Sequence, residues 1–177
     1  NDRDVNSRIL LGNIYYEQGK YDEAAKQYRD ALDRSPENGA LMFNLASALM
    51  KRGDEMSAIE YFKKAGSTDK IGDVAYRAYG QLGALYLDRL AHDEAEKYLK
   101  MAVSVRPGDA TNHYNLGIAY LRQNKREEAI AELRKAEELG EQNTALLQNL
   151  GEAYINLKDY DRGLAVFGKL RGMSGRN

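Results

Sequence analysis

Side chains that commonly carry out chemistry are sparse in this sequence. It contains two histidines, His92 and His113, and no cysteine, and no carboxylates stand at the spacing of a metal site. The segment GKLRGMSG at 168–175 has glycines and a lysine, but it fits neither a phosphate-binding loop nor a nucleophile elbow. We therefore expect a protein that is not an enzyme, with no catalytic residue, no metal and no cofactor.

Composition indicates one ordinary soluble domain. The 177 residues are 43% apolar, and 26 basic side chains nearly balance 27 acidic ones, so no net field draws the chain to nucleic acid or an anionic membrane. No apolar run approaches the roughly 20 residues of a membrane helix, and no leader opens the chain. We expect no nucleic-acid partner and no membrane insertion. The compartment, cytoplasm or periplasm, stays open, and the start at Asn1 indicates a mature form or a fragment.

A repeat organises the whole chain. Small residues recur at Gly12, Ala46, Gly83, Gly117 and Gly151, with spacings of 46−12=34, 83−46=37, 117−83=34 and 151−117=34. Each follows a leucine and precedes a tyrosine or leucine by three positions, so the two large side chains share a helix face beside a point of close approach. Polar breaks such as EQGKYD then separate this helix from a second one. We predict five antiparallel helix pairs in one array, at roughly 5–38, 39–72, 76–109, 110–143 and 144–177.

Polar residues at matching positions predict where the first helix of each pair begins. The N-cap candidates are Asp4, Asn38, Asp109 and Asn143. The third copy has Ala75 at this position and three extra residues before it. We expect these residues to lengthen its first helix by about one turn, at about 1.5 Å per residue, with a cap near Asp73.

The pattern of Leu-Gly, Tyr, Ala, an aromatic residue and Pro over about 34 residues resembles the tetratricopeptide repeat. The resemblance covers nearly the whole chain, although Lys70 and Glu141 replace the closing proline and the family's tryptophan is absent. Its position holds Arg8, Met42, Tyr79, His113 and Leu147. The resemblance implies an all-α fold, a right-handed α-α superhelix or solenoid of antiparallel helix pairs, with the first helices lining its concave wall.

The first helices carry a second apolar stripe opposite the packing stripe. At about 100° per residue, Tyr114 and Leu121 fall on the side away from Leu116. An outer surface would be polar there, so the stripe favours a groove that binds a peptide or helix of another protein. The predicted groove residues are Ile9, Asn13, Tyr16, Phe43, Asn44, Ser47, Met50, Arg77, Leu87, Tyr114, Ile118, Leu121, Arg122, Glu152 and Ile155.

Two other interpretations of these residues stay open. The apolar ones can pack between adjacent first helices, and the asparagines that recur at the Asn44 position can be interhelix hydrogen-bonding groups. One subclass of the resembled family grips a terminal carboxylate with asparagines and basic residues, and Asn13, Asn44 and Arg77 match three of its positions. Ile9 and Gln81 stand where further basic residues are expected, which weakens that match.

We therefore predict a non-enzymatic adaptor or scaffold that holds a partner protein. One alternative is self-assembly into a homo-oligomer through the terminal repeats, because the last helix carries Leu164, Phe167 and Leu170 with no polar helix after it. Another alternative is that the array is the targeting arm of a larger protein.

Overall fold

The computed structural model describes residues 2–68, 72–140 and 144–174, and these residues form ten helices and no strand. The helices are α1 (Asp2–Glu17), α2 (Tyr21–Leu32), α3 (Gly39–Arg52), α4 (Glu55–Thr68), α5 (Asp73–Asp88), α6 (His92–Val105), α7 (Ala110–Arg122), α8 (Arg126–Glu138), α9 (Thr144–Asn156) and α10 (Tyr160–Ser174). The all-α prediction is confirmed. One consecutive pair of helices corresponds to each predicted copy, although α1 begins three residues before the first predicted bound and α5 three residues before the third.

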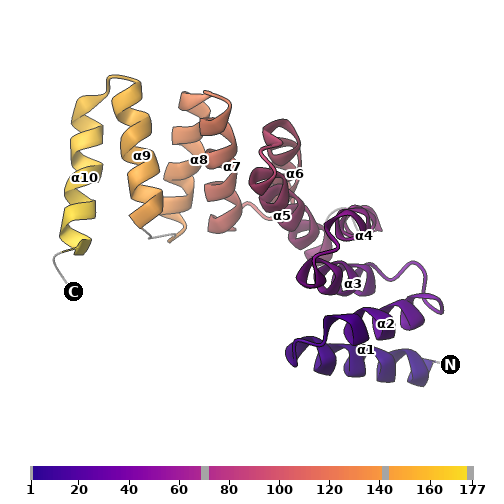
Figure 1. Cartoon of the computed structure of the whole chain (residues 1–177). Helices are drawn as coiled ribbons and strands as arrows, with labels where there is room; N and C mark the ends of the chain where they lie inside the picture. Colours follow the sequence, from indigo (N-terminus) through magenta and orange to yellow (C-terminus); the bar gives the residue numbers. More distant parts are fainter. Residues whose placement is uncertain (1, 69–71, 141–143, 175–177) are drawn as a thin grey trace. The chain divides into compact units, whose positions relative to one another are not determined.

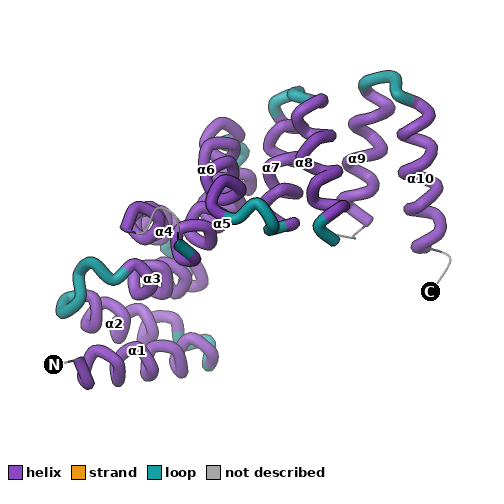
Figure 2. The backbone as a smooth tube through the Cα atoms, turned by 180° about the vertical axis from the view of Figure 1, so that it is seen from behind, coloured by secondary structure: helices purple, strands orange, loops and turns teal. Residues whose placement is uncertain are grey.

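The chain divides into two compact units, unit 1 at residues 1–82 and unit 2 at residues 83–177, with the boundary inside α5. Within unit 2, helices α7 to α10 lie side by side and alternate in direction (Figure 1). In unit 1, α1 and α2 form an antiparallel pair, and α3 packs beside α2 (Figure 2). None of the described helices combines the length and apolarity needed to cross a membrane.

A left-handed residue turns the chain between the two helices of each pair. The residues at this position are Gly19, Gly53, Leu90, Asn124 and Lys158, with φ of 74°, 92°, 58°, 62° and 62°. The next amide then bonds back over the helix end, as from Lys125 N to the carbonyl oxygen of Tyr120 at 2.9 Å. This cap supplies the tight turn that the sequence predicts between paired helices.

The predicted helix starts are correct in two copies and wrong in one. Asn38 accepts a hydrogen bond from Leu41 N at 3.0 Å, and Asp109 accepts one from Asn112 N at 2.8 Å. Asp4 is not an N-cap, because α1 already begins at Asp2 and the Asp4 carboxylate pairs with Arg8 inside the helix. The fourth candidate, Asn143, lies outside the described residues.

The first helix of the third copy is longer than those of the second, fourth and fifth copies, but not longer than that of the first. Helix α5 has 16 residues, against 14 in α3 and 13 in α7 and in α9, and α1 also has 16 without an insertion. Asp73 is the first residue of α5, one position inside the helix compared with the expected cap. Acidic side chains in a first turn are stabilised by the positive end of the helix dipole. Residues 69–71 of the insertion lie outside the described residues.

The two helices of a pair lie close together at the predicted glycine positions. A Cβ built on Gly117 would lie 2.7 Å from Leu133 Cγ, and one on Gly151 would lie 2.8 Å from Phe167 Cζ. Carbon atoms in contact normally stay about 3.5 to 4.0 Å apart. A side chain at either position would therefore push the second helix away.

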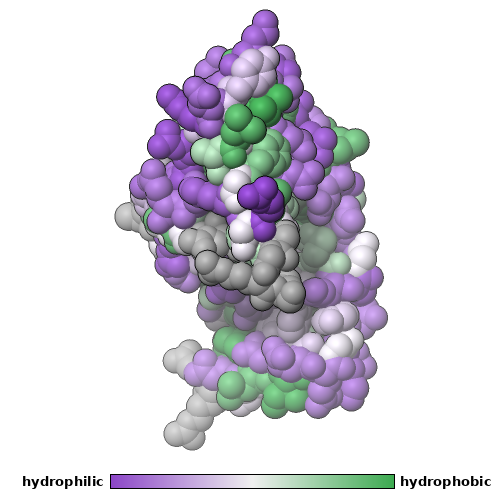
Figure 3. All heavy atoms as spheres, turned by 90° about the vertical axis from the view of Figure 1, so that its left-hand side faces the viewer, coloured by the Kyte–Doolittle hydropathy of each residue, from purple (hydrophilic) through white to green (hydrophobic). Residues whose placement is uncertain are grey.

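The leucine column is buried in four copies and exposed in the first. Leu45, Leu82, Leu116 and Leu150 are at most 2% exposed, whereas Leu11 is 39% exposed. Packing of Leu11 was predicted wrongly, because no described helix covers that face of α1. At the other end of the array, Leu164 on α10 is 69% exposed, and Figure 3 shows apolar side chains interrupting the hydrophilic surface there. Phe167 and Leu170 are partly buried instead.

Candidate functional site

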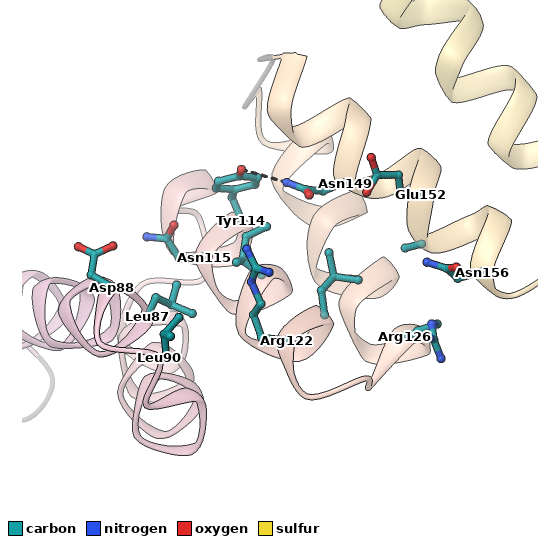
Figure 4. Close-up of a pocket in the computed structure, with 13 residues that line it drawn as sticks. Leu87, Asp88, Leu90, Tyr114, Asn115, Arg122, Arg126, Asn149, Glu152 and Asn156 are labelled. Atoms are coloured by element: carbon teal, nitrogen blue, oxygen red, sulfur yellow. Dashed lines mark hydrogen bonds between the residues drawn. The ribbon is translucent and has the colours of Figure 1, made fainter.

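Each unit has a concavity lined by its first helices. The cavity of unit 2, here the α7 cavity, has a volume of about 570 Å³. Its walls come from the end of α5, from α7, from the start of α8 and from α9 (Figure 4). It is lined by Leu87, Asp88, Leu90, Tyr114, Asn115, Ile118, Leu121, Arg122, Arg126, Asn149, Glu152, Ala153 and Asn156. Six of the predicted groove residues are among them.

A hydrogen bond joins α7 and α9 at this cavity. Asn149 Nδ2 donates to the hydroxyl oxygen of Tyr114 at 3.2 Å, as Figure 4 shows. The recurring asparagine thus acts here as an interhelix hydrogen-bonding group, which was one of the two interpretations. The bond holds the Tyr114 side chain against α9.

Leu121 and Tyr114 belong partly to the core. Both are half-buried and pack against the cluster formed by α8, α9 and α10, and Leu121 also contacts the cluster formed by α6, α7 and α8. Packing between first helices, the less specific interpretation, therefore applies to these two side chains. Truncating Leu121 would disturb folding as well as any groove function.

The cationic side chains of unit 2 differ in their pairing. Lys100 and Lys125 both bind Glu96, at 2.6 Å and 2.7 Å. Burial alone would raise the pKa of Glu96, but hydrogen bonds from Lys100, Lys125 and Gln123 outweigh it and lower the pKa to about 2. In contrast, Arg122 and Arg126 form no ion pair with any residue that the structure describes.

The cavity of unit 1, here the α3 cavity, is smaller, at about 310 Å³. It is lined by Asn13, Tyr16, Glu17, Tyr28, Phe43, Asn44, Ser47 and Arg77, so it brings together six more predicted groove residues, including the three that match the carboxylate-gripping subclass. Ile9 and Gln81, where that subclass has basic residues, do not line it.

Most polar groups of the α3 cavity already have partners within the protein. Asn13 Oδ1 accepts a hydrogen bond from the Tyr28 hydroxyl at 2.7 Å, and Ser47 Oγ donates to the Phe43 carbonyl oxygen at 2.9 Å. Burial, followed by the nearby Tyr16 and Glu17, raises the pKa of Tyr28 to about 12, so this hydroxyl keeps its proton as a donor. The Arg77 guanidinium carbon lies 4.3 Å from the centre of the Phe43 ring, a cation–π contact.

Three predicted groove residues line neither cavity. Ile9 and Met50 are half-buried at other positions, and Ile155 is 38% exposed. Two lining residues of the α7 cavity lie outside the first helices and were missed. These are Leu90 in the α5–α6 turn and Arg126 at the start of α8. The signal for Leu90 was a leucine at the turn position where other copies carry glycine or a polar residue.

The two histidines lie on different helices, His92 at the start of α6 and His113 on α7. His113 is 6% exposed, and its Nδ1 lies 2.6 Å from Glu132 Oε2 while its Nε2 lies 2.9 Å from the Pro107 carbonyl oxygen. This arrangement ties α7 to α8 and to the preceding loop. Among the described residues, no three His, Cys, Asp or Glu side chains gather as metal ligands would.

Comparisons with known proteins identify the repeat. Residues 9–70 match the tetratricopeptide repeat family, and residues 88–170 match the family of anaphase-promoting complex, cyclosome, subunit 3. Tetratricopeptide repeat protein 21B of Homo sapiens is 31% identical over 141 residues, which cover 75% of this chain and 10% of that protein. BBSome complex member BBS4 of Bos taurus is 28% identical over 153 residues, which cover 86% of this chain and 29% of that protein.

A solved structure gives the same result for the fold. The crystal structure of MamA protein superposes with a TM-score of 0.85 at 23% identity, covering 96% of this chain and 91% of that one. This chain belongs to the tetratricopeptide repeat family and has its helical-repeat fold. It spans less than a third of the length of the two relatives named above.

Proposed function

We propose that this chain is a non-enzymatic interaction module that binds a peptide or helix of a partner protein in the α7 cavity. The observation that carries the proposal is the convergence of apolar, amide and unpaired cationic side chains from three neighbouring first helices on one concavity of about 570 Å³. Binding sites for segments of other proteins combine apolar contacts with a few polar groups in this way.

Membership of the tetratricopeptide repeat family supports an interaction role rather than a catalytic one. The small net charge of −1 and the presence of both acidic and basic side chains in the cavity also favour a protein segment over nucleic acid. The same balance gives no reason to invoke a cofactor.

Selection from a random displayed-peptide library, with the purified chain as bait, tests the proposal. Selected peptides should bind the protein in a fluorescence anisotropy titration and lose at least about tenfold in affinity with Arg122→Ala or Asn156→Ala, as binding anchors often do. The matched control is Arg134→Ala, an exposed arginine on α8 that does not line the cavity. Selected peptides that bind these variants as tightly as the unmodified chain would place binding elsewhere.

Self-assembly is a second candidate, and exposed apolar side chains at both ends of the array favour it. Leu11 and Ile14 on α1 are 39% and 52% exposed, and Leu164 on α10 is 69% exposed. Residues at the Leu11 and Leu164 positions are buried between neighbouring repeats elsewhere, as Leu116 and Ile130 are. Sedimentation velocity over a concentration series would show an association that Leu164→Asn abolishes; a monomer at every concentration would remove this candidate.

The third possibility, that the array is the targeting arm of a larger protein, is consistent with the longer relatives. The peptide selected above would then identify what the arm holds. A fusion of this chain to an unrelated reporter enzyme should bring the reporter to that peptide on a coated surface, and an unfused reporter should stay in solution.

A further inference from the structure

Leu90 occupies a backbone conformation that a leucine rarely adopts. Its φ is 58°, in the left-handed region, and the corresponding turn positions hold Gly19, Gly53, Asn124 and Lys158. Glycine adopts this conformation without steric cost, and asparagine tolerates it, whereas a leucine Cβ crowds the neighbouring carbonyl oxygen. The α5–α6 turn therefore holds a strained residue at a position where glycine or asparagine, found in other turns of this chain, would be less strained.

The Leu90 side chain contributes little to the stability of the fold. It is 72% exposed, so most of its apolar surface stays in water, and what it lines is the α7 cavity. Burial of a leucine stabilises a protein only through surface that is removed from water. Strain combined with exposure of an apolar side chain is a feature of functional sites, where a ligand covers the side chain.

Arg126 breaks a second local rule at the same cavity. It is the first residue of α8, where the helix dipole is positive and an acidic side chain would be favoured. Its neighbour Lys125 binds Glu96, but Arg126 and Arg122 pair with no carboxylate among the residues that the structure describes. Two guanidinium groups of the cavity thus have no direct ion-pair partner among the described residues, although Asp88 and Glu152 line the same cavity.

We propose that the partner of the α7 cavity is an acidic peptide segment with a large apolar side chain. This inference rests on the proposed function and names the chemistry of its ligand. The apolar side chain covers Leu87 and Leu90, and carboxylates beside it bind Arg122 and Arg126. Arginine is well suited to carboxylates because its planar group donates two parallel hydrogen bonds.

The acidic residues of the cavity set the position of such a segment. Asp88 lies beside Leu87 at the end of α5, and Glu152 lies on α9, on the other side of Arg122 (Figure 4). Arg126, at the start of α8, lies on the Glu152 side of the cavity (Figure 4). Glu152 also accepts a hydrogen bond from Gln148 Nε2 at 3.0 Å. A carboxylate of the partner is attracted by Arg122 and Arg126 and repelled by Asp88, so the negative charges of the segment should lie mainly on the arginine side of its apolar anchor.

The probes are fluorescein-labelled octapeptides with blocked ends. One is Gly-Asp-Asp-Leu-Phe-Asp-Asp-Gly; the second carries lysine in place of each aspartate, and the third carries serine in place of leucine and phenylalanine. Anisotropy titrations of the full chain should show binding of the first peptide and at least about tenfold weaker binding of the other two. Binding of the first should weaken about fivefold to fiftyfold with Leu90→Asn or Arg126→Ala.

Matched variants separate this role from a general effect on folding. Leu164→Asn removes an equally exposed leucine outside the cavity, and Arg134→Ala removes an exposed arginine of α8, so both should leave binding unchanged. Leu90→Asn should also raise the midpoint of thermal unfolding by about 2 to 4 °C, because the strain is relieved while binding is lost. If Leu90 only supported the fold, Leu90→Asn would lower both the affinity for the peptide and the midpoint of thermal unfolding.

Several outcomes would overturn the inference. Equal binding of the lysine peptide would contradict an acidic partner. Unchanged binding by the Leu90→Asn variant would contradict the role of Leu90 as a contact for the apolar side chain. Concentration-dependent self-association that Leu90→Asn abolishes would assign the cavity to a second copy of the chain. If the library-selected peptides still bind through Arg122 in any of these cases, the proposed function survives; if no peptide of any kind binds, both fail.

Discussion

The cavities of units 1 and 2 are both lined mainly by the first helices of repeats. They differ in which of their side chains have interaction partners inside the protein. In the α3 cavity, Asn13 is bonded to Tyr28, and Arg77 lies on the Phe43 ring. In the α7 cavity, Arg122 and Arg126 lack ion-pair partners among the described residues, and Leu90 is exposed. Groups that are satisfied inside the protein rigidify it, whereas unsatisfied groups gain from a ligand.

The helix–helix turns show the same difference. Both turns wholly inside unit 1 have glycine at the left-handed position, Gly19 and Gly53, whereas unit 2 has Leu90, Asn124 and Lys158. Unit 1 therefore follows the local rule for stability at its turns, and unit 2 departs from it beside the larger cavity. We interpret unit 1 as the better-optimised structural half and unit 2 as the half that carries recognition.

The largest expected effect concerns the leucine column. Leu116 is 2% exposed in the core of unit 2, and Leu11 is 39% exposed on α1 of unit 1. Leu116→Ala should lower the free energy of unfolding by about 2 to 5 kcal/mol, as truncation of a buried leucine does, and Leu11→Ala by less than about 1 kcal/mol. Urea unfolding followed by circular dichroism measures both. Equal losses would show that Leu11 is covered in solution, which supports self-association.

The glycine column should behave alike in both units. A Cβ on Gly12 would lie 2.6 Å from Tyr28 Cε1, and one on Gly117 would lie 2.7 Å from Leu133 Cγ. Gly12→Val and Gly117→Val should each lower the free energy of unfolding by about 1 to 3 kcal/mol through overpacking. Gly168→Val is the control, because no atom lies within 4 Å of that added Cβ. A loss of stability in only one of the two variants would show that the helix pairs of the two units are not packed in the same way.

Much of the fold could be predicted from the sequence, because burial repeats with the period of the helix pair. Asn38 and Asp109 are N-caps as their positions indicate, whereas Asp4 is not, since a helix start depends on where the preceding chain joins. Twelve groove residues do line a cavity. Leu90 and Arg126 were missed because the stripe was sought on first helices only, whereas these two residues lie in the α5–α6 turn and at the start of α8.

Acid should lower the stability of unit 2, because the Glu96 carboxylate becomes protonated. Its pKa is about 2 in the folded chain, against a usual value of 4.5, so its contribution is complete above about pH 4.5 and lost as the pH falls toward 2. The side chain is 15% exposed, and with allowance for solvent screening Glu96→Gln should cost about 1 to 2 kcal/mol at neutral pH and nothing near pH 2. Urea unfolding across this pH range measures the difference.

The matched variant for Glu96 is in unit 1. Glu60→Gln removes an exposed pair with Lys64 inside α4 alone, so it should change stability less than Glu96→Gln at neutral pH. The Glu96 pair joins α6 to the start of α8 instead, through Lys125. An equal loss in both variants would mean that the link between repeats adds nothing to unit 2.

The smallest expected effect compares the turns directly, with a reciprocal pair of substitutions. Lys158 has φ of 62°, and replacing it with glycine removes the crowding of its Cβ, although the unfolded chain gains freedom. The net result of Lys158→Gly in unit 2 should be a gain of about 0.5 to 1 kcal/mol in the free energy of unfolding. Gly53 has φ of 92° and no atom within 4 Å of an added Cβ, so Gly53→Ala in unit 1 should lose a similar amount through the backbone alone. Opposite signs in urea unfolding would confirm that unit 1 already holds the preferred turn residue. A loss in Lys158→Gly would show that the turns of unit 2 are not strained, and the case for Leu90 as a residue kept for binding would lose its energetic basis.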